Sequence, residues 1–350
     1  MKKLKAGIIG QGRSGKDIHA HLLTLIPDKF EIVAVVDPLE DRCALARKAY
    51  ACEAFKTVEE MLEKRRDLDL VINATPSHLH LPVSEQVLKA GFNVLCEKPF
   101  GRRVVDVDRV IATSKKVGKT LAVFQQSRFA PYFQQVKTVV DSGVLGRIVM
   151  VKIAFNGFAR RWDWQTIRKM DAGNLLNTGP HPLDQALHFI GRDAMPEVFC
   201  IMDNVQTFGD AEDHVKLILR RKNRPTIDLE ISSCCTYSPY TYVVYGSRGS
   251  LAGTMNHIEW KYYKDSEAPA QKLITEPMPN CSFCSEQLDM HEEKWDTPVT
   301  NLFDYMGISF YEHLYDTLVN GAPLAVALEE VRQQVAVIEE AHRQNGSYKS

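Results

Sequence analysis

The stretch AGIIGQGRSG, residues 6–15, decides the fold of this 350-residue chain. An apolar run, Ala6–Gly10, predicts a strand, and it leads through a GxGxxG loop into a helical pattern near 15–26. Gly10 permits a tight turn, Gly12 lets the backbone approach a pyrophosphate, and Gly15 lets the helix pack close to the strand. In this setting the loop, with Arg13 and Ser14 at the amino end of the helix, predicts a dinucleotide site.

The end of the second apolar strand, Ile32–Asp37, bears on the choice of cofactor. A carboxylate at Asp37 can accept hydrogen bonds from ribose hydroxyls and repels a 2′-phosphate, so NAD is favoured over NADP. Arg13 and Arg42 keep NADP open as the less favoured cofactor, because an arginine can accommodate that phosphate. An aspartate before Pro38 can also cap a helix, and this role is compatible with the first.

The first 125 residues alternate short apolar runs with helical patterns, which predicts a doubly wound parallel sheet of the Rossmann type. Further strands are expected at Leu70–Ala74, Val94–Cys96 and Leu121–Phe124, with helices near 40–50, 57–65, 78–90 and 104–117. We therefore expect an NAD-binding domain over residues 1–125.

The pattern changes after about residue 146, where residues 149–155 and 226–231 alternate polar and apolar side chains. Such strands bury one face, so residues 126–350 predict an open, mostly antiparallel sheet with helices on one face. The other face is a natural surface for self-association. Two helices near 300–320 and 327–344 close the chain and can pack back on the first domain. The irregular region 264–298 is expected to be a lid or an inter-subunit contact.

Two further motifs carry a family resemblance. They are Ala74-Thr75-Pro76-Ser-His78-Leu-His80 and Glu97-Lys98-Pro99, at the ends of the predicted strands Leu70–Ala74 and Val94–Cys96. Together with the glycine loop, the run Arg160-Arg-Trp162-Asp-Trp164 and the run Gly173–Asp184, they make the chain resemble the Gfo/Idh/MocA family of glucose–fructose oxidoreductase and inositol dehydrogenase. The resemblance covers almost the whole chain. It implies a Rossmann domain followed by an open sheet that often mediates oligomers, hence a homodimer or homotetramer.

The resemblance also implies roles for individual residues. Thr75, Pro76, His80, Glu97 and Gln126 would line the cofactor, with Lys98 held at the reacting carbon and His181 as the acid/base. Many members carry an aspartate four residues before that histidine, whereas this chain has Asn177. The implied activity is NAD-dependent interconversion of a secondary alcohol and a ketone on a sugar, sugar derivative or cyclitol.

Residues around His181 suggest how its proton is managed. Thr178-Gly-Pro-His-Pro is typical of a helix entry with Thr178 as the N-cap. Asp184 lies about one helical turn after His181, so either Asp184 or the Asn177 amide is expected to orient the imidazole. A packed or capping histidine is the alternative for His181.

Three other side chains have two interpretations each. Trp162 and Trp164 would stack on a sugar face or form a buried pair under the domain junction. Arg128 would contact the substrate or form a surface ion pair. His19 and His21, in the first helix, are expected to be packing or solvated residues.

The composition excludes several classes of protein. The chain is 45% hydrophobic and 25% charged with a formal net charge of -1, so it carries no electrostatic signature of a nucleic-acid or membrane partner. No apolar run is long enough for a membrane helix, which favours a cytoplasmic protein with reduced thiols. Cys281 and Cys284 form a lone CxxC, so no metal site is expected.

Two other functions stay open. One is a glycosidase that acts through transient oxidation with no net release of NADH. The other is a non-catalytic member that senses a dinucleotide, although such a sensor would need neither Lys98 nor His181.

Overall fold

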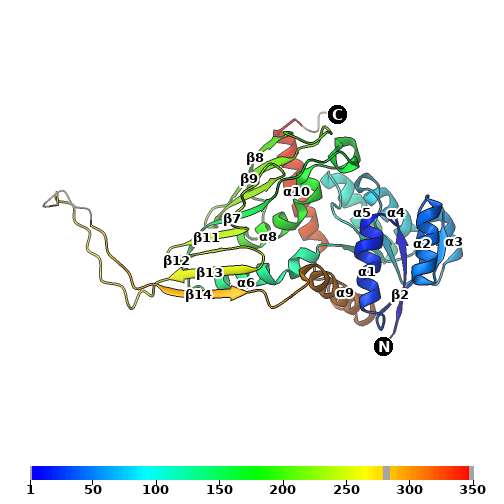
Figure 1. Cartoon of the computed structure of the whole chain (residues 1–350), viewed down its shortest axis with the longest axis horizontal. Coiled ribbons are helices and arrows are strands. Elements are labelled where there is room, and N and C mark those ends of the chain that lie inside the picture. Colours follow the sequence, from blue (N-terminus) through cyan, green and yellow to red (C-terminus); the bar gives the residue numbers. More distant parts are fainter. Residues whose placement is uncertain (1, 279–283, 347–350) are drawn as a thin grey trace.

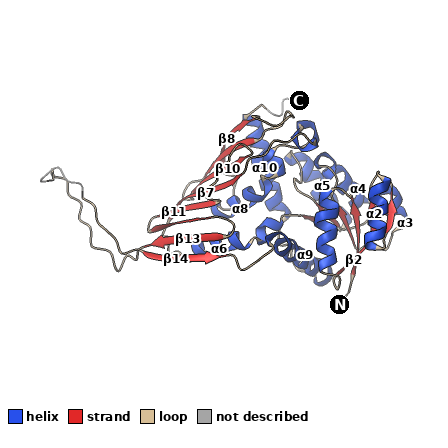
Figure 2. Cartoon of the chain, in the orientation of Figure 1, coloured by secondary structure: helices blue, strands red, loops and turns tan. Residues whose placement is uncertain are grey.

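The computed structural model describes residues 2–278 and 284–346. It contains two β-sheets, and several helices lie between them (Figure 1). Figure 2 shows the smaller sheet enclosed by helices and the larger sheet covered on one side only.

The first sheet has six parallel strands in the order β3-β2-β1-β4-β5-β6. These are β1 (Leu4–Ile9), β2 (Phe30–Val36), β3 (Glu53–Phe55), β4 (Leu70–Asn73), β5 (Val94–Cys96) and β6 (Leu121–Val123). The order reverses between β1 and β4, the point at which doubly wound sheets bind ligands beyond the carboxyl ends of the strands. The predicted parallel Rossmann-type sheet is confirmed. The short strand β3 was not predicted, because Glu53–Phe55 is too short to show a period.

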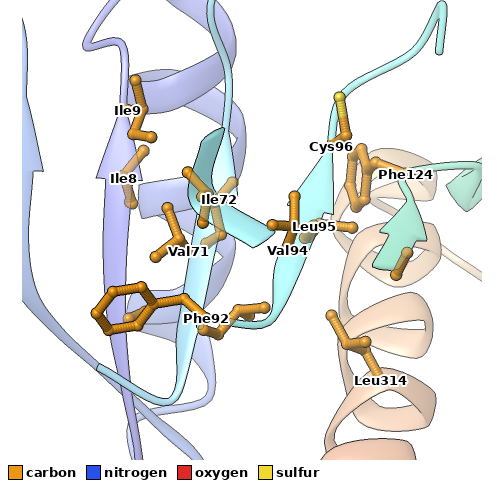
Figure 3. Packing of buried hydrophobic residues seen from close by; sticks show 14 of the residues in the cluster. Ile8, Ile9, Val71, Ile72, Phe92, Val94, Leu95, Cys96, Phe124 and Leu314 are labelled. Carbon is orange, nitrogen blue, oxygen red and sulfur yellow. The ribbon is translucent and has the colours of Figure 1, made fainter. Parts of the chain in front are cut away.

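Helices cover this sheet: η1 (Ser14–Ala20), α1 (His21–Leu25), α2 (Glu40–Tyr50), α3 (Val58–Lys64), η2 (Ser77–Leu79), α4 (His80–Lys89) and α5 (Val104–Val117). The first of them, η1, is a π-helix that continues into α1. Figure 3 shows apolar side chains of β1, β4 and β5 in the core; Ile8, Ile72 and Leu95 are register neighbours and so lie on one face of the sheet.

The second sheet has eight strands in the order β14-β13-β12-β11-β7-β10-β9-β8, and only β7 and β10 pair in parallel. The strands are β7 (Ile148–Asn156), β8 (Glu197–Asp203), β9 (His214–Arg220), β10 (Thr226–Ser232), β11 (Tyr242–Gly246), β12 (Gly249–Gly253), β13 (His257–Tyr262) and β14 (His291–Asp296). This confirms the expected open, mostly antiparallel sheet.

Helical segments precede and cover this sheet: η3 (Gln126–Phe129), α6 (Pro131–Asp141), η4 (Trp164–Thr166), η5 (Arg168–Met170), α7 (Asn174–Asn177) and α8 (Pro180–Ile190). On β9, Val215, Leu217 and Leu219 are buried under the helices, and the side chains between them point to the open face. This alternation is why one face of the sheet packs and the other does not.

The terminal helices connect the two halves. Helix α9 (Leu302–Asn320) places Phe310, Tyr311 and Leu314 in the core of the parallel sheet, where Leu314 is visible in Figure 3. Helix α10 (Leu328–Gln344) contributes Val331 and Val335 to that core and Val337 and Ile338 to the core of the second sheet. Because one helix is buried in both cores, the two halves are held in a fixed relation, and the edge between them can form a site.

The region 264–298 contains β14, which the sequence did not predict. Between β13 and β14, residues 263–278 and 284–290 run far out from the sheet (Figure 1). Cys281 of the CxxC lies outside the described residues, and Cys284 is an exposed free thiol. Within residues 2–278 and 284–346, no helix has the length and apolarity to span a bilayer, and no cluster of metal-ligating side chains is found.

Candidate functional site

A cleft of about 660 Å³ opens at the carboxyl edge of the parallel sheet. Its lining comes from the segments that follow β1, β2, β3, β4 and β5, including the starts of the helices there, and from η4. It includes these sequence-predicted residues: Gly10, Gly12, Arg13, Ser14, Asp37, Thr75, Pro76, His80, Glu97 and Lys98. Residues that the sequence did not single out, such as Thr57, Ser77 and Gln165, complete the lining.

Each glycine of the loop has a different steric reason to lack a side chain. Gly10 has φ +91°, and a Cβ there would lie 2.6 Å from the Ala74 carbonyl oxygen. A Cβ on Gly15 would lie 1.8 Å from the Gly10 carbonyl oxygen, so helix η1 can pack here only against glycine. At Gly12 the nearest atom would be Arg42 Nη1 at 3.9 Å, so the space above it is open. The loop thus leaves room at the helix amino end for a phosphate group.

Asp37 closes the other side of this loop and is only 2% exposed. Its carboxylate accepts the backbone N–H of Gln11 at 2.8 Å and of Leu39 at 2.9 Å, and Arg42 Nη1 lies 3.3 Å away. Asp37 therefore fixes the loop, orders the entry to α2 and lines the cleft at once. The carboxylate retains acceptor capacity for ribose hydroxyls, so the glycine loop and Asp37 fit a dinucleotide such as NAD.

His80 joins the two turns that form the middle of the cleft. Its ring lies 2.7 Å from the Pro99 carbonyl oxygen through Nδ1 and 2.9 Å from the Thr75 carbonyl oxygen through Nε2. Burial lowers the pKa of this histidine. The turns after β4 and β5 are thereby held at a fixed separation. Gln126, expected along the cofactor, is buried in η3 and is not part of the cleft lining.

Lys98 lies at the inner end of the cleft. Its Nζ donates a hydrogen bond to the backbone oxygen of Asn177 at 2.8 Å, which joins β5 to α7. Burial lowers the pKa of Lys98, the adjacent Glu97 opposes that shift, and the charges of Arg13 and Arg161 reinforce it. The result is an ammonium group that is easier to deprotonate than an ordinary lysine.

His181, at the start of α8, is not part of the cleft lining, but the charge of Lys98 acts on it. Its Nδ1 is 3.1 Å from Ser127 Oγ, and burial followed by the charge of Lys98 lowers its pKa to about 3. The positive charge of Lys98 thus disfavours a second positive charge on His181. Lys98 itself has Glu97 and the Asn177 carbonyl beside it. His181 is then neutral and able to accept a proton.

Asn177 does not orient the imidazole as expected. Its amide nitrogen donates to the Gln165 backbone oxygen at 2.7 Å, while its buried Oδ1 has no hydrogen-bond partner among the described residues. An unsatisfied buried acceptor is costly unless a donor reaches it. Asn177 therefore offers an acceptor where a carboxylate was the expected group.

The expected roles of Asp184 and Arg128 are both wrong. Asp184 is directed away from His181: its carboxylate accepts from Arg128 at 2.7 and 3.0 Å and from Arg192 at 2.6 Å. Arg128 also binds Glu330 and the Ala325 carbonyl, so it is neither a surface ion pair nor a substrate contact. This buried ionic network joins η3, α8 and α10 beneath the site.

The two tryptophans are not a pair. Trp162 is 77% exposed and Trp164 lines the cleft, so neither forms the buried pair that was one alternative. Thr178 ends α7 instead of capping α8, whose N-cap is Gly179. His19, expected to be an unremarkable packing residue, lies 3.3 Å from the Glu97 carboxylate. No local sequence pattern predicts that contact, because His19 and Glu97 are distant in sequence.

The fold and the site together define a dinucleotide-binding protein of the oxidoreductase class. Residues 4–125 match the model of the Gfo/Idh/MocA oxidoreductase family with an NAD-binding Rossmann fold, and residues 133–252 match the C-terminal domain of the same family. The chain belongs to this family.

Some similar proteins have a named activity. The chain is 29% identical over 259 residues to inositol 2-dehydrogenase from Rhizobium meliloti, covering 71% of this chain and 75% of that protein. It is 28% identical over 262 residues to 2,7-anhydro-N-acetylneuraminate hydratase from Mediterraneibacter gnavus, covering 72% and 67%. The WlbA dehydrogenase from Bordetella pertussis, solved with NADH and UDP-GlcNAcA, superposes with a TM-score of 0.77 at 22% identity, covering 98% and 96% of the two chains. That last likeness concerns the fold.

Proposed function

We propose that this protein is an NAD-dependent dehydrogenase that interconverts a secondary alcohol and a ketone on a sugar, sugar derivative or cyclitol. The observation that carries the proposal is the position of Lys98, which lines a dinucleotide-type cleft, bonds to the Asn177 carbonyl and lies near enough to His181 for its charge to lower the pKa of that histidine. The dehydrogenase relative that acts on inositol, 29% identical, supports the substrate class.

In the proposed reaction, each residue of the site has a separate role. NAD, bound along the cleft, supplies the hydride acceptor or donor. The Lys98 ammonium donates a hydrogen bond to the substrate oxygen and stabilises its developing negative charge. Neutral His181 accepts the hydroxyl proton as the alcohol is oxidised and returns it in the reverse direction. Asn177 Oδ1 accepts a hydrogen bond from a neighbouring substrate hydroxyl and so orients the ring, while Trp164 offers an apolar surface at the cleft wall.

We propose NAD in preference to NADP. Asp37 is fixed by two backbone N–H groups, so it cannot swing away from a 2′-phosphate without loss of the loop geometry. Arg42, 3.3 Å from Asp37, is already engaged by that carboxylate. Both observations disfavour a phosphorylated ribose.

The decisive experiment is NADH absorbance with the purified full chain, NAD⁺ and a panel of inositols, sugars and sugar acids. Steady formation of NADH with at least one polyol supports the dehydrogenase. A relative is named as a hydratase, so conversion of a substrate without net NADH is the competing outcome. Product analysis in the same samples distinguishes the two, and binding of the dinucleotide without turnover of any compound favours a sensor.

We also propose that the chain self-associates through the open face of its larger sheet. Phe199 and Ile201 on β8 are 58% and 51% exposed, on the face opposite the buried Cys200. Tyr245 on β11 is 42% exposed and carries the Lys152 ammonium over its ring. Light scattering should give a dimer or tetramer for the natural chain and a smaller species for Ile201→Lys. An unchanged mass would contradict this interface.

A further inference from the structure

Three buried side chains from distant segments form a line behind the inner end of the cleft. His19 of η1 and Tyr311 of α9 are fully buried, and Glu97 at the end of β5 is 3% exposed. His19 Nδ1 lies 2.6 Å from the Tyr311 hydroxyl, and His19 Nε2 lies 3.3 Å from Glu97 Oε1. The other carboxylate oxygen, Oε2, accepts the Lys98 backbone N–H at 3.0 Å. We call this line the Tyr311–His19–Glu97 relay.

The contacts of the relay favour a charged carboxylate at its end. Burial raises the pKa of Tyr311 well above its usual value, so its hydroxyl keeps its proton and can donate a hydrogen bond to His19 Nδ1. In that arrangement the imidazole proton is on Nε2, 3.3 Å from Glu97 Oε1. Burial alone would raise the pKa of Glu97, but the neighbouring His19 and Lys98 lower it to about 2. The relay therefore holds a charged carboxylate in a buried place.

That carboxylate has no equivalent at its end of the cleft. The carboxylates lining the cleft are Asp37, Glu59 and Glu97; Asp37 follows β2, and Glu59 lies in the first turn of α3. Besides Glu97, the charges that act on Lys98 are those of Arg13 and Arg161, both positive. Without Glu97, the charges acting at Lys98 would all be positive and would repel a further positive charge.

We propose that the Tyr311–His19–Glu97 relay sets the redox preference of the bound cofactor, favouring NAD⁺ over NADH. The nicotinamide ring is positive when oxidised and neutral when reduced, so a fixed buried negative charge beside it stabilises the oxidised form selectively. The inference rests on the proposed placement of that ring beside Glu97 and Lys98. Glu97 acts through its charge, and His19 and Tyr311 are positioning residues.

The test compares the affinities of NAD⁺ and NADH for the full chain by calorimetric titration, with no substrate present. Glu97→Gln should raise the ratio of the dissociation constants, NAD⁺ over NADH, by roughly tenfold, as expected for one charge several ångströms away in a partly buried site. Glu59→Gln is the matched control, because it removes a carboxylate from the same cleft at its other end. That variant should leave the ratio unchanged.

If Glu97→Gln does not fold, a second variant tests the same relay. Tyr311→Phe keeps the ring contacts with Phe30 and Phe124 and removes only the hydroxyl. It should move the same ratio in the same direction by about twofold to threefold. Nitrogen NMR of His19 should show the proton on Nε2 in the natural chain and a mixture of tautomers in Tyr311→Phe.

The possible outcomes distinguish failure of the proposed function from failure of the redox role of the relay. If the natural chain binds neither form of the cofactor, the proposed function falls and this inference with it. If both forms bind and the ratio stays the same in Glu97→Gln and Tyr311→Phe, the proposed function stands and the redox role of the relay is wrong.

Discussion

The two ends of the cleft are built in different ways. The outer end is made by one short stretch, Gly10–Gly15, together with Asp37, and its geometry follows from which backbone atoms lie too close for a Cβ. The inner end gathers Lys98 from β5, Ser127 from η3 and His181 from α8, and its properties follow from burial and charge. The outer end is thus defined by local sequence and shape, whereas the inner end depends on how the two halves of the chain pack.

The largest expected effect tests whether chemistry is confined to the inner end. Lys98→Met should lower kcat about a thousandfold or more, because it removes the donor that stabilises the substrate oxygen, while NAD affinity changes by about threefold at most. Lys56→Met is the control, since Lys56 lines the outer end and pairs with Glu40. It should leave kcat within about twofold. Equal losses in both variants would remove the distinction between the ends.

The next effect separates shape from ligand contact at the outer end. Gly15→Ala should destabilise the protein by about 3 kcal/mol, because its Cβ would overlap the Gly10 carbonyl oxygen. Gly12→Ala should change the free energy of unfolding by less than about 0.5 kcal/mol and weaken NAD binding about tenfold, since its Cβ points into open space. Urea unfolding and cofactor titration measure the two effects. Similar stability losses in both variants would contradict the steric argument.

The comparison also explains what the sequence could reveal. The parallel sheet and the positions of Gly10 and Asp37 were predictable, because periodicity and a local motif specify them, and the place of Lys98 followed from the family resemblance. The ionic partners of Asp184 were not, because Arg128 and Arg192 reach it from segments whose packing no local pattern encodes. The contact between His19 and Glu97 was missed for the same reason, since it depends on how η1 packs against the end of β5.

A pH experiment addresses the buried histidine of the inner end. The pKa of His181 is about 3 in the folded protein against 6.5 as its ordinary value, so the unfolded chain binds more protons between these values. Its stabilising contribution is therefore full above pH about 6.5 and falls as the pH drops toward 3, by about 2 kcal/mol at pH 5. His181→Gln should unfold with a correspondingly smaller difference between pH 7.5 and pH 5. His313→Gln, which changes an exposed histidine, should keep the natural difference.

The smallest effect concerns cofactor choice at the outer end. Asp37→Asn should weaken NAD binding about tenfold, because an amide oxygen accepts ribose hydroxyls less strongly than a carboxylate and cannot hold both backbone N–H groups equally well. The same change removes the charge that repels a 2′-phosphate and frees Arg42 from its ion pair, so NADP binding should improve or stay unchanged. Because the two cofactors differ only at that phosphate, the ratio of their dissociation constants cancels any general loosening of the loop. A ratio that does not move would contradict the proposal that the Asp37 charge governs the choice of cofactor.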